Sequence, residues 1–267
     1  MHGWQDMDGA ALDAAYNNVD HIEDGAGYPP RWAAEAAAFR AATPGERDIP
    51  YGETPGAAFD LFHPAGAARG LVVFVHGGYW RRFGKSDFSQ FAEGALARDH
   101  AVAVVGYPLA PQLRIAGITA HVARAVDAAA ARVDGPIRLT GHSAGGHLVA
   151  RVAMADAAPA CAARIVTCVP ISPVADLAPL VPQALNADLR LDADEARAES
   201  PVAGPPMPGP KVAVHVGAAE RPSFLWQADR LGAAWGVPVR RIPGAHHFDV
   251  IDALRDPDSP LLADLMA

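Results

Sequence analysis

The most informative segment of this chain is Ile137-Arg-Leu-Thr-Gly-His-Ser-Ala-Gly-Gly-His-Leu-Val-Ala150. Its apolar start, residues 137–140, predicts a buried strand, and residues 146–155 predict a helix. The pattern G-x-S-x-G between them predicts a sharp turn, since small neighbours of Ser143 tolerate a strained backbone. Such a turn lifts the hydroxyl clear of the sheet. Ser143 is therefore the candidate nucleophile.

The rest of the chain alternates between strand and helix patterns, which predicts an α/β fold with a mostly parallel central sheet covered by helices on both faces. We expect one domain, 1–267, with a helical N-terminal segment, 1–50, and a cap-like insertion, 174–210. Strands are expected at 57–63, 71–75, 101–106, 165–171, 211–216 and 237–242, and helices at 12–18, 30–41, 115–133, 223–235 and 248–254.

Composition narrows the class of partner. The chain has 267 residues, 51% hydrophobic and 19% charged, with a net charge of −8. An acidic surface disfavours nucleic acid and anionic membranes, so a small-molecule substrate is expected. No apolar run reaches about 18 residues, and Cys161 and Cys168 read as free thiols, which favours the cytoplasm. The oligomeric state stays open, with a homodimer as one option.

A serine hydroxyl needs a base, and in this architecture the base follows the last strand. The chain offers His246 and His247 there, and His247 is preferred because Phe248 begins the closing helix. His246 would then line the pocket or be held by the backbone. His142 and His147, which flank the serine, are interpreted as packing or hydrogen-bonding residues.

An acid should orient that histidine from the end of the penultimate strand. Glu220 lies a few residues beyond the strand expected at 211–216, and it is the preferred acid. Asp176, which follows the preceding strand, remains the alternative. Asp249 is too close to His247 in sequence to reach it comfortably.

An oxyanion formed on the substrate needs backbone donors fixed in advance. His76-Gly77-Gly78 follows the strand at 71–75, and the amides of Gly78, Tyr79 and Ala144 are the predicted donors. Tyr79 and Trp80 are the predicted aromatic walls of the substrate pocket, with His246 beside them. The chain lacks H-E-x-x-H and phosphate-loop motifs, so no metal or cofactor is expected.

With these residues in view, the chain resembles the kynurenine formamidase (arylformamidase) branch of the α/β-hydrolase superfamily and its bacterial esterase-like members. The most specific match is H-G-G-x-W, here His76 to Trp80. Further matches are Tyr16-Asn17-Asn18 and the segments 141–146, 172–177, 185–186, 189–191, 217–224 and 247–249. Many members have Asp where this chain has Glu220, which keeps the carboxylate but changes its reach.

The resemblance implies a metal-free serine hydrolase that cleaves N-formylkynurenine to kynurenine and formate, with Ser143 and His247 as catalysts. A carboxylesterase acting on small acyl or aryl esters would use the same residues. The alternative from another class is a non-catalytic relative that binds a small molecule, although such proteins usually lose a catalytic residue.

Overall fold

The computed structural model describes residues 4–267, and its centre is a nine-stranded sheet. The strand order is β1-β2-β4-β3-β5-β6-β8-β9, and the short β7 pairs with β6. β2 runs antiparallel to both β1 and β4, whereas every later pairing is parallel. The strands are Gly45–Pro50, Ala58–Phe62, Leu71–Val75, Ala101–Val105, Ile137–His142, Ile165–Ile171, Lys211–Val212, Val214–Gly217 and Val239–Ile242.

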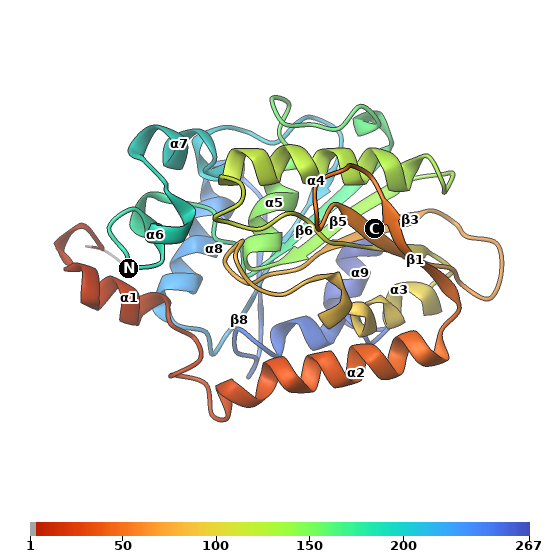
Figure 1. Ribbon diagram of the computed structural model, residues 1–267, viewed down its shortest axis with the longest axis horizontal. Helices are drawn as coiled ribbons and strands as arrows, with labels where there is room; N and C mark the ends of the chain where they lie inside the picture. The colour runs from red at the N-terminus through yellow and green to blue at the C-terminus, as the bar shows by residue number, and fades with distance from the viewer. Residues whose placement is uncertain (1–3) are drawn as a thin grey trace.

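Helices cover both faces of this sheet (Figure 1). One face carries α4, α5 and α8, and the other carries α2, α3 and α9. The helices α1 and α6 lie at one end of the molecule in Figure 1. The bounds of α1 to α9 are Gly9–Tyr16, Tyr28–Ala42, Glu93–Ala97, Ile115–Ala130, Ala144–Val152, Asn186–Leu189, Ala193–Ala198, Pro222–Trp235 and Pro260–Met266.

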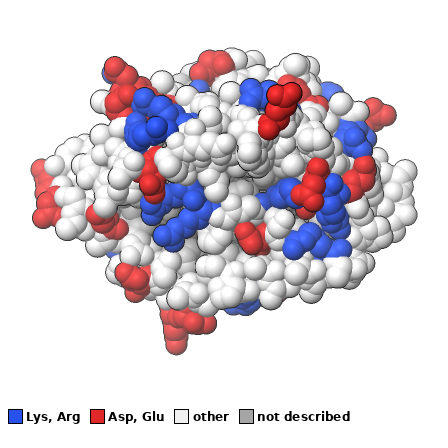
Figure 2. Space-filling view, viewed as in Figure 1, with Lys and Arg blue, Asp and Glu red and all other residues white. Residues whose placement is uncertain are grey.

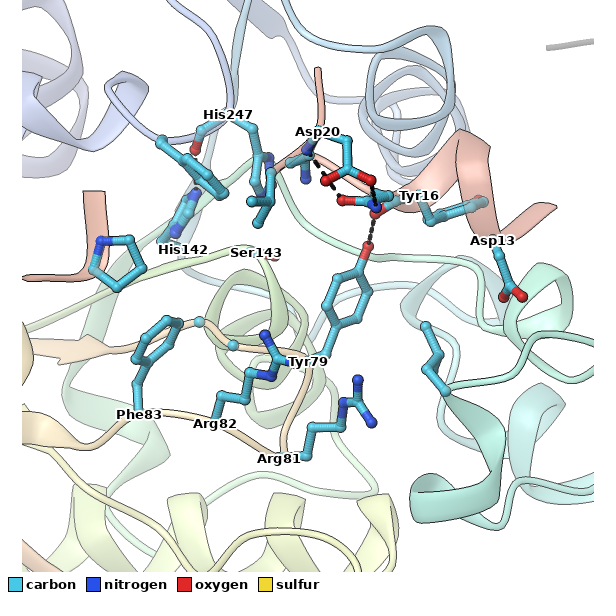
Figure 3. Close-up of a pocket in the computed structure, with 18 of the residues that line it drawn as sticks. Asp13, Tyr16, Asp20, Tyr79, Arg81, Arg82, Phe83, His142, Ser143 and His247 are labelled. Carbon is cyan, nitrogen blue, oxygen red and sulfur yellow. Dashed lines mark hydrogen bonds between the residues drawn. The ribbon is translucent and has the colours of Figure 1, made fainter. Parts of the chain in front are cut away.

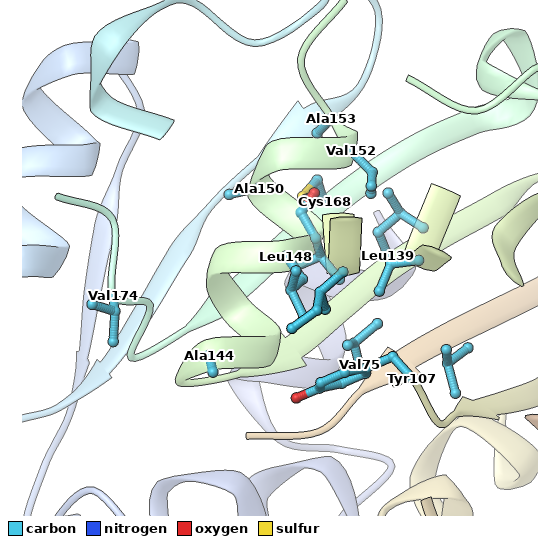
Figure 4. Close-up of a cluster of buried hydrophobic side chains, with 14 of the residues drawn as sticks. Val75, Tyr107, Leu139, Ala144, Leu148, Ala150, Val152, Ala153, Cys168 and Val174 are labelled. Atoms are coloured by element: carbon cyan, nitrogen blue, oxygen red, sulfur yellow. Dashed lines mark hydrogen bonds between the residues drawn. The ribbon is translucent and has the colours of Figure 1, made fainter. Parts of the chain in front are cut away.

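The central strands separate two hydrophobic cores. All five residues of β3, Leu-Val-Val-Phe-Val, are buried, and successive side chains point to opposite faces. Leu71, Val73 and Val75 join the core under α4, α5 and α8, whereas Val72 and Phe74 join the core under α2 and α9. Figure 4 shows the first core closing around α5. This burial fixes the register of the sheet, and with it the edge at which the parallel strands end.

Three details differ from the sequence expectations. The segment 1–50 is not wholly helical, because Gly45–Pro50 pairs with β2 as an edge strand. The strand expected at 211–216 divides into β7 and β8, which pair with β6 at separate points. The helix expected at 248–254 is a 3-10 turn over Val250–Leu254, and α9 closes the chain instead. In α9, Leu261, Leu262 and Leu265 carry the apolar periodicity that packs on the sheet.

Residues 174–210 contain only short helices, namely α6, α7 and the 3-10 turns Ala178–Leu180 and Pro201–Ala203. They lie between β6 and β7 in the chain, beside the edge at which the parallel strands end. No helix in residues 4–267 combines the length and apolarity that crossing a membrane requires.

Candidate active site

Ser143 occupies the turn between β5 and α5 with a strained backbone, φ 56° and ψ −115°. Its N–H donates to the carbonyl of Ile171 at 2.8 Å, which ties the turn to β6. A Cβ at Gly145 would lie 2.0 Å from the carbonyl oxygen of Val75, and one at Gly141 would lie 2.4 Å from that of Gly145. Only glycine fits at these positions. The G-x-S-x-G pattern therefore reflects the close approach of backbone to backbone.

His247 and Glu220 form a buried pair. Nδ1 of His247 donates to Oε2 of Glu220 at 2.7 Å, and the two side chains are 4% and 0% exposed. The other carboxylate oxygen accepts the N–H of Gly217 at 2.8 Å and the hydroxyl of Ser172. The carboxylate is thus held from three directions, which fixes the tautomer and orientation of the imidazole. Nε2 of His247 makes no hydrogen bond within residues 4–267 and remains available.

Asp176, the alternative acid, lies elsewhere. Its carboxylate pairs with Arg230 at 3.1 Å and accepts the N–H of Ala178, while its own N–H donates to Gln227. The structure therefore brings Glu220, and not Asp176, to His247.

The histidines beside the serine are neutral structural groups. Nε2 of His142 donates to the backbone carbonyl of His247 at 2.8 Å, and burial holds the pKa of His142 well below its usual range. His147 donates to the carbonyl of Glu199 at 2.7 Å, and burial lowers its pKa to about 4. His142 thus holds the loop that carries the candidate base.

The loop after β3 lies directly against the serine turn. A Cβ at Gly77 would lie 3.0 Å from the carbonyl oxygen of His142 and 3.2 Å from Cβ of Ser143. Gly78 has φ 108° and Tyr79 has φ 49°, so the backbone bends sharply here. Across the described chain, the N–H groups of Gly78, Tyr79 and Ala144 donate to no protein acceptor. These three amides remain free beside Ser143.

A cavity of about 540 Å³ opens over these groups (Figure 3). Ser143, His142 and His247 line it together with the Gly77–Tyr79 loop. The segment 174–210 contributes Gln183, Ala184 and Leu185 to the lining. Much of the remaining wall is aromatic, formed by Trp32, Phe83, Phe88 and Phe248 with Tyr79. A planar apolar group fits such a lining.

Two predicted pocket residues are corrected by the structure. Trp80 is fully buried in the core, where its indole packs edge-on against His147 with 5.0 Å between ring centroids. His246 is not part of the cavity lining: Nδ1 accepts the N–H of Phe248 at 3.1 Å, and the ring hydrogen-bonds to the hydroxyl of Tyr28 at 3.0 Å. Neither side chain lines the cavity: Trp80 is enclosed by the core, and both ring nitrogens of His246 are hydrogen-bonded to protein groups.

Sequence reasoning missed the contribution of the N-terminal segment. Tyr16, Asn17 and Asp20 line the cavity, and the carbonyl of Tyr16 accepts the Tyr79 hydroxyl at 2.7 Å. The Tyr-Asn-Asn run was visible as a family match, but its position carries no local signal. Ser172, with φ 46° and a hydrogen bond to Glu220, was missed for the same reason.

Within the part of the chain that the structure describes, no group of three or more His, Cys, Asp or Glu side chains is arranged to hold a metal ion. The chemistry available at this site is that of a hydroxyl, an imidazole–carboxylate pair and free amides.

Comparison with known proteins shows which fold the chain has and which enzymes it is similar to. Residues 72–199 match a family described as having the alpha/beta hydrolase fold. The chain is 27% identical to kynurenine formamidase of Salmo salar over 79% of this chain and 77% of the relative, and 30% identical to that of Danio rerio over 58% and 54%. It therefore spans about half the length of the latter.

Among solved structures, a protein of Silicibacter sp. TM1040, provisionally described as a thioesterase, is 49% identical with a TM-score of 0.94. This match covers 96% of this chain and 99% of the other. An esterase of Pyrobaculum calidifontis, at 20% identity and a TM-score of 0.65, covers 90% and 88% and shares the fold. The chain belongs to the α/β-hydrolase fold family and is a hydrolase.

Proposed function

We propose that this protein is an arylformamidase that hydrolyses N-formylkynurenine to kynurenine and formate through a formyl-enzyme. The observation that carries the proposal is the cavity itself. Its wall brings Ser143 and the Glu220-supported His247 together with aromatic side chains. The similarity to two fish kynurenine formamidases supports the same substrate.

In the proposed reaction, Nε2 of His247 takes the proton of Ser143 as Oγ attacks the formyl carbon. The amides of Gly78, Tyr79 and Ala144 bind the resulting oxyanion. The protonated His247 then gives its proton to the aryl amine, the C–N bond breaks, and the amine leaves. Water, deprotonated by His247, attacks the formyl ester, and formate departs as Ser143 regains its proton. Glu220 stabilises the imidazolium in both halves of the cycle.

A second candidate is an esterase or thioesterase that uses the same residues on an ester carbonyl. The specific observation in its favour is the 49% identity to the Silicibacter protein provisionally described as a thioesterase. The insertion, 174–210, would act as a cap in either case, because residues 183–185 form part of the cavity wall.

The test is a comparison of kcat/KM for N-formylkynurenine, p-nitrophenyl acetate and a short acyl thioester. We expect the formamide to be preferred, and Ser143→Ala to lower its turnover by roughly a million-fold. Ser89→Ala is a matched control, because Ser89 is a buried serine that is not part of the cavity lining, and its hydroxyl contacts the Lys85 carbonyl and the Arg40 guanidinium. A preference for either ester would overturn the formamidase assignment, and unchanged turnover in Ser143→Ala would overturn the mechanism.

A further inference from the structure

Two arginines, Arg81 and Arg82, follow the Gly77–Tyr79 loop, and they differ in their contacts with other side chains. Both line the cavity. Arg81 forms an ion pair with Asp188 of α6, so its positive charge is neutralised by direct contact. Arg82 is exposed, and its guanidinium has no ion pair or side-chain hydrogen bond to any residue between 4 and 267. The cavity therefore has a positive charge in its wall that no protein group neutralises by direct contact.

The backbone of Arg82 is fixed to the turn that carries the proposed oxyanion donors. Its N–H donates to the carbonyl of Gly78 at 3.0 Å, and the N–H of Arg81 donates to the same oxygen at 3.1 Å. A Cβ at Gly78 would lie 2.5 Å from the carbonyl oxygen of Arg82, so the turn is closed tightly. The backbone of Arg82, from which its side chain extends, thus has a fixed position relative to the proposed oxyanion donors.

The opposite charge lies elsewhere on the same lining. Asp13 and Asp20 both come from the N-terminal segment. Asp13 accepts the N–H of Ala184 at 2.9 Å, and Asp20 accepts the amide of Asn17 at 2.7 Å. Figure 3 shows Arg81 and Arg82 on one side of Tyr79 and Asp20 on the other. A lining with separated positive and negative groups complements a zwitterion better than a simple anion or cation.

We infer that Arg82 binds a carboxylate on the leaving group of the substrate, and that the site selects acyl derivatives whose leaving group carries an α-amino acid. The inference rests on the proposed function in one respect, namely that Ser143 reacts in this cavity. A guanidinium presents two parallel N–H donors to a carboxylate, so Arg82 contributes to substrate affinity and orientation and takes no part in bond making or breaking.

Ligand binding to the Ser143→Ala protein tests this without any turnover. L-kynurenine and kynuramine share the aryl ketone and the amine, but kynuramine lacks the carboxylate. Calorimetry should find kynurenine bound about 10- to 100-fold more tightly than kynuramine. Adding Arg82→Gln should remove that difference and leave kynuramine affinity within about twofold.

Arg197→Gln is the matched control, because Arg197 is 68% exposed, pairs only with the nearby Asp194 and lies outside the cavity lining. It should leave both affinities unchanged. Equal affinities of the Ser143→Ala protein for kynurenine and kynuramine would overturn the inference. Equal weakening of both affinities by the added Arg82→Gln substitution would overturn it as well.

A kinetic comparison separates this inference from the formamidase proposal. Phenyl acetate and 3-acetoxybenzoate differ only by a carboxylate on the leaving group. The inference requires a higher kcat/KM for 3-acetoxybenzoate that disappears in Arg82→Gln. If N-formylkynurenine is not hydrolysed but this Arg82-dependent preference is present, the formamidase proposal fails and the carboxylate site stands. If N-formylkynurenine is hydrolysed equally well by the wild type and Arg82→Gln, the carboxylate site fails and the formamidase stands.

Discussion

At the scale of single residues, Glu220 shows how side-chain length is absorbed by the backbone. Glutamate has one methylene more than aspartate, the other carboxylate that can orient a catalytic histidine. Oε1 is held by the N–H of Gly217 and the hydroxyl of Ser172, which leaves Oε2 to meet His247 at 2.7 Å. A Cβ at Gly217 would lie 3.2 Å from Cγ of Glu220, so the side chain curls back over its own turn. The extra methylene is therefore accommodated within the loop.

Replacing Glu220 tests this arrangement. Glu220→Gln keeps the shape but removes the charge that stabilises an imidazolium, and its amide also permits the wrong tautomer of His247. We expect kcat to fall by about 10⁴-fold with little change in the free energy of unfolding. Asp176→Asn should stay within about tenfold of the wild type, since Asp176 pairs with Arg230. The reverse order of the two effects would contradict the assignment of Glu220.

At the scale of elements, the site depends on how closely α5 crosses the ends of β3 and β5. The backbone of Gly145 passes the carbonyl of Val75 without room for a side chain, and Gly146 likewise passes the carbonyl of Ile171, where a Cβ would lie 2.9 Å away. These contacts bring the first turn of α5, with its free N–H at Ala144, over the sheet edge. The helix dipole then favours negative charge beside Ser143.

This crossing predicts a large difference between two glycine substitutions. Gly145→Ala places a methyl group 2.0 Å from the carbonyl oxygen of Val75, so α5 must shift, and we expect a loss of about 3 kcal/mol or more in the free energy of unfolding. Gly66→Ala adds a methyl group with nothing within 4 Å and should change stability by less than about 0.5 kcal/mol. Urea unfolding of both variants measures the difference. Equal free energies of unfolding for the two variants would show that the turn between β5 and α5 is not tightly packed.

Three segments that are distant in sequence contact one another over the cavity. The Tyr79 hydroxyl donates to the carbonyl of Tyr16 at 2.7 Å, the N–H of Ala184 donates to Asp13, and Arg81 pairs with Asp188. The N-terminal segment, the loop after β3 and residues 174–210 thus hold one another in place. The shape of this part of the cavity is set jointly by all three.

At the scale of the whole molecule, the surface mixes both signs of charge. On the face seen in Figure 2, basic side chains lie on both sides of the middle, and acidic ones are scattered around them, many near the outline. The net charge of −8 is therefore a poor guide to the cavity, where Arg82 contributes a positive charge that no side chain in residues 4–267 pairs with. Local arrangement, more than the total, determines which substrate charge is favoured.

Buried histidines make stability depend on pH. Burial lowers the pKa of His76 and of His147 to about 4, against an ordinary value near 6.5. Between those values the unfolded chain binds protons that the native protein does not, so stability is lost as the pH falls. Each histidine contributes a slope of up to about 1.4 kcal/mol per pH unit. Asp252, whose pKa burial raises to about 6, opposes this trend below pH 6.

Urea unfolding at pH 7.5, 6.0 and 5.0 should therefore show a steep decline in stability. His147→Gln keeps a donor near the carbonyl of Glu199 but cannot titrate, so its decline should be shallower by about 1 kcal/mol per pH unit. The comparison within one protein cancels the contributions of all other groups. Parallel declines for the wild type and His147→Gln would contradict a neutral buried His147.

The features that can be predicted from the sequence are those whose signal is local. The strand at 71–75 has the bounds that its sequence predicts, because a strand buried on both faces is an unbroken apolar run. The predicted bounds of the strand at 165–171 also match β6, although Thr167 interrupts its apolar pattern. The serine turn, with glycines at 141 and 145, was equally visible. The alternating elements gave the mostly parallel sheet. The candidate triad order followed from the fold.

Packing between distant parts of the chain determines which side chains reach the cavity. Trp80 and Tyr79 are adjacent and both aromatic, yet one is buried in the core and the other lines the site. His247 lines the cavity and its neighbour His246 does not. Glu220 reaches His247, whereas Asp176 pairs with Arg230. Each outcome depends on long-range contacts, such as that of Tyr28 with His246. A pattern of neighbours in sequence carries no information about packing partners many residues away, so these choices emerge only when the chain is folded.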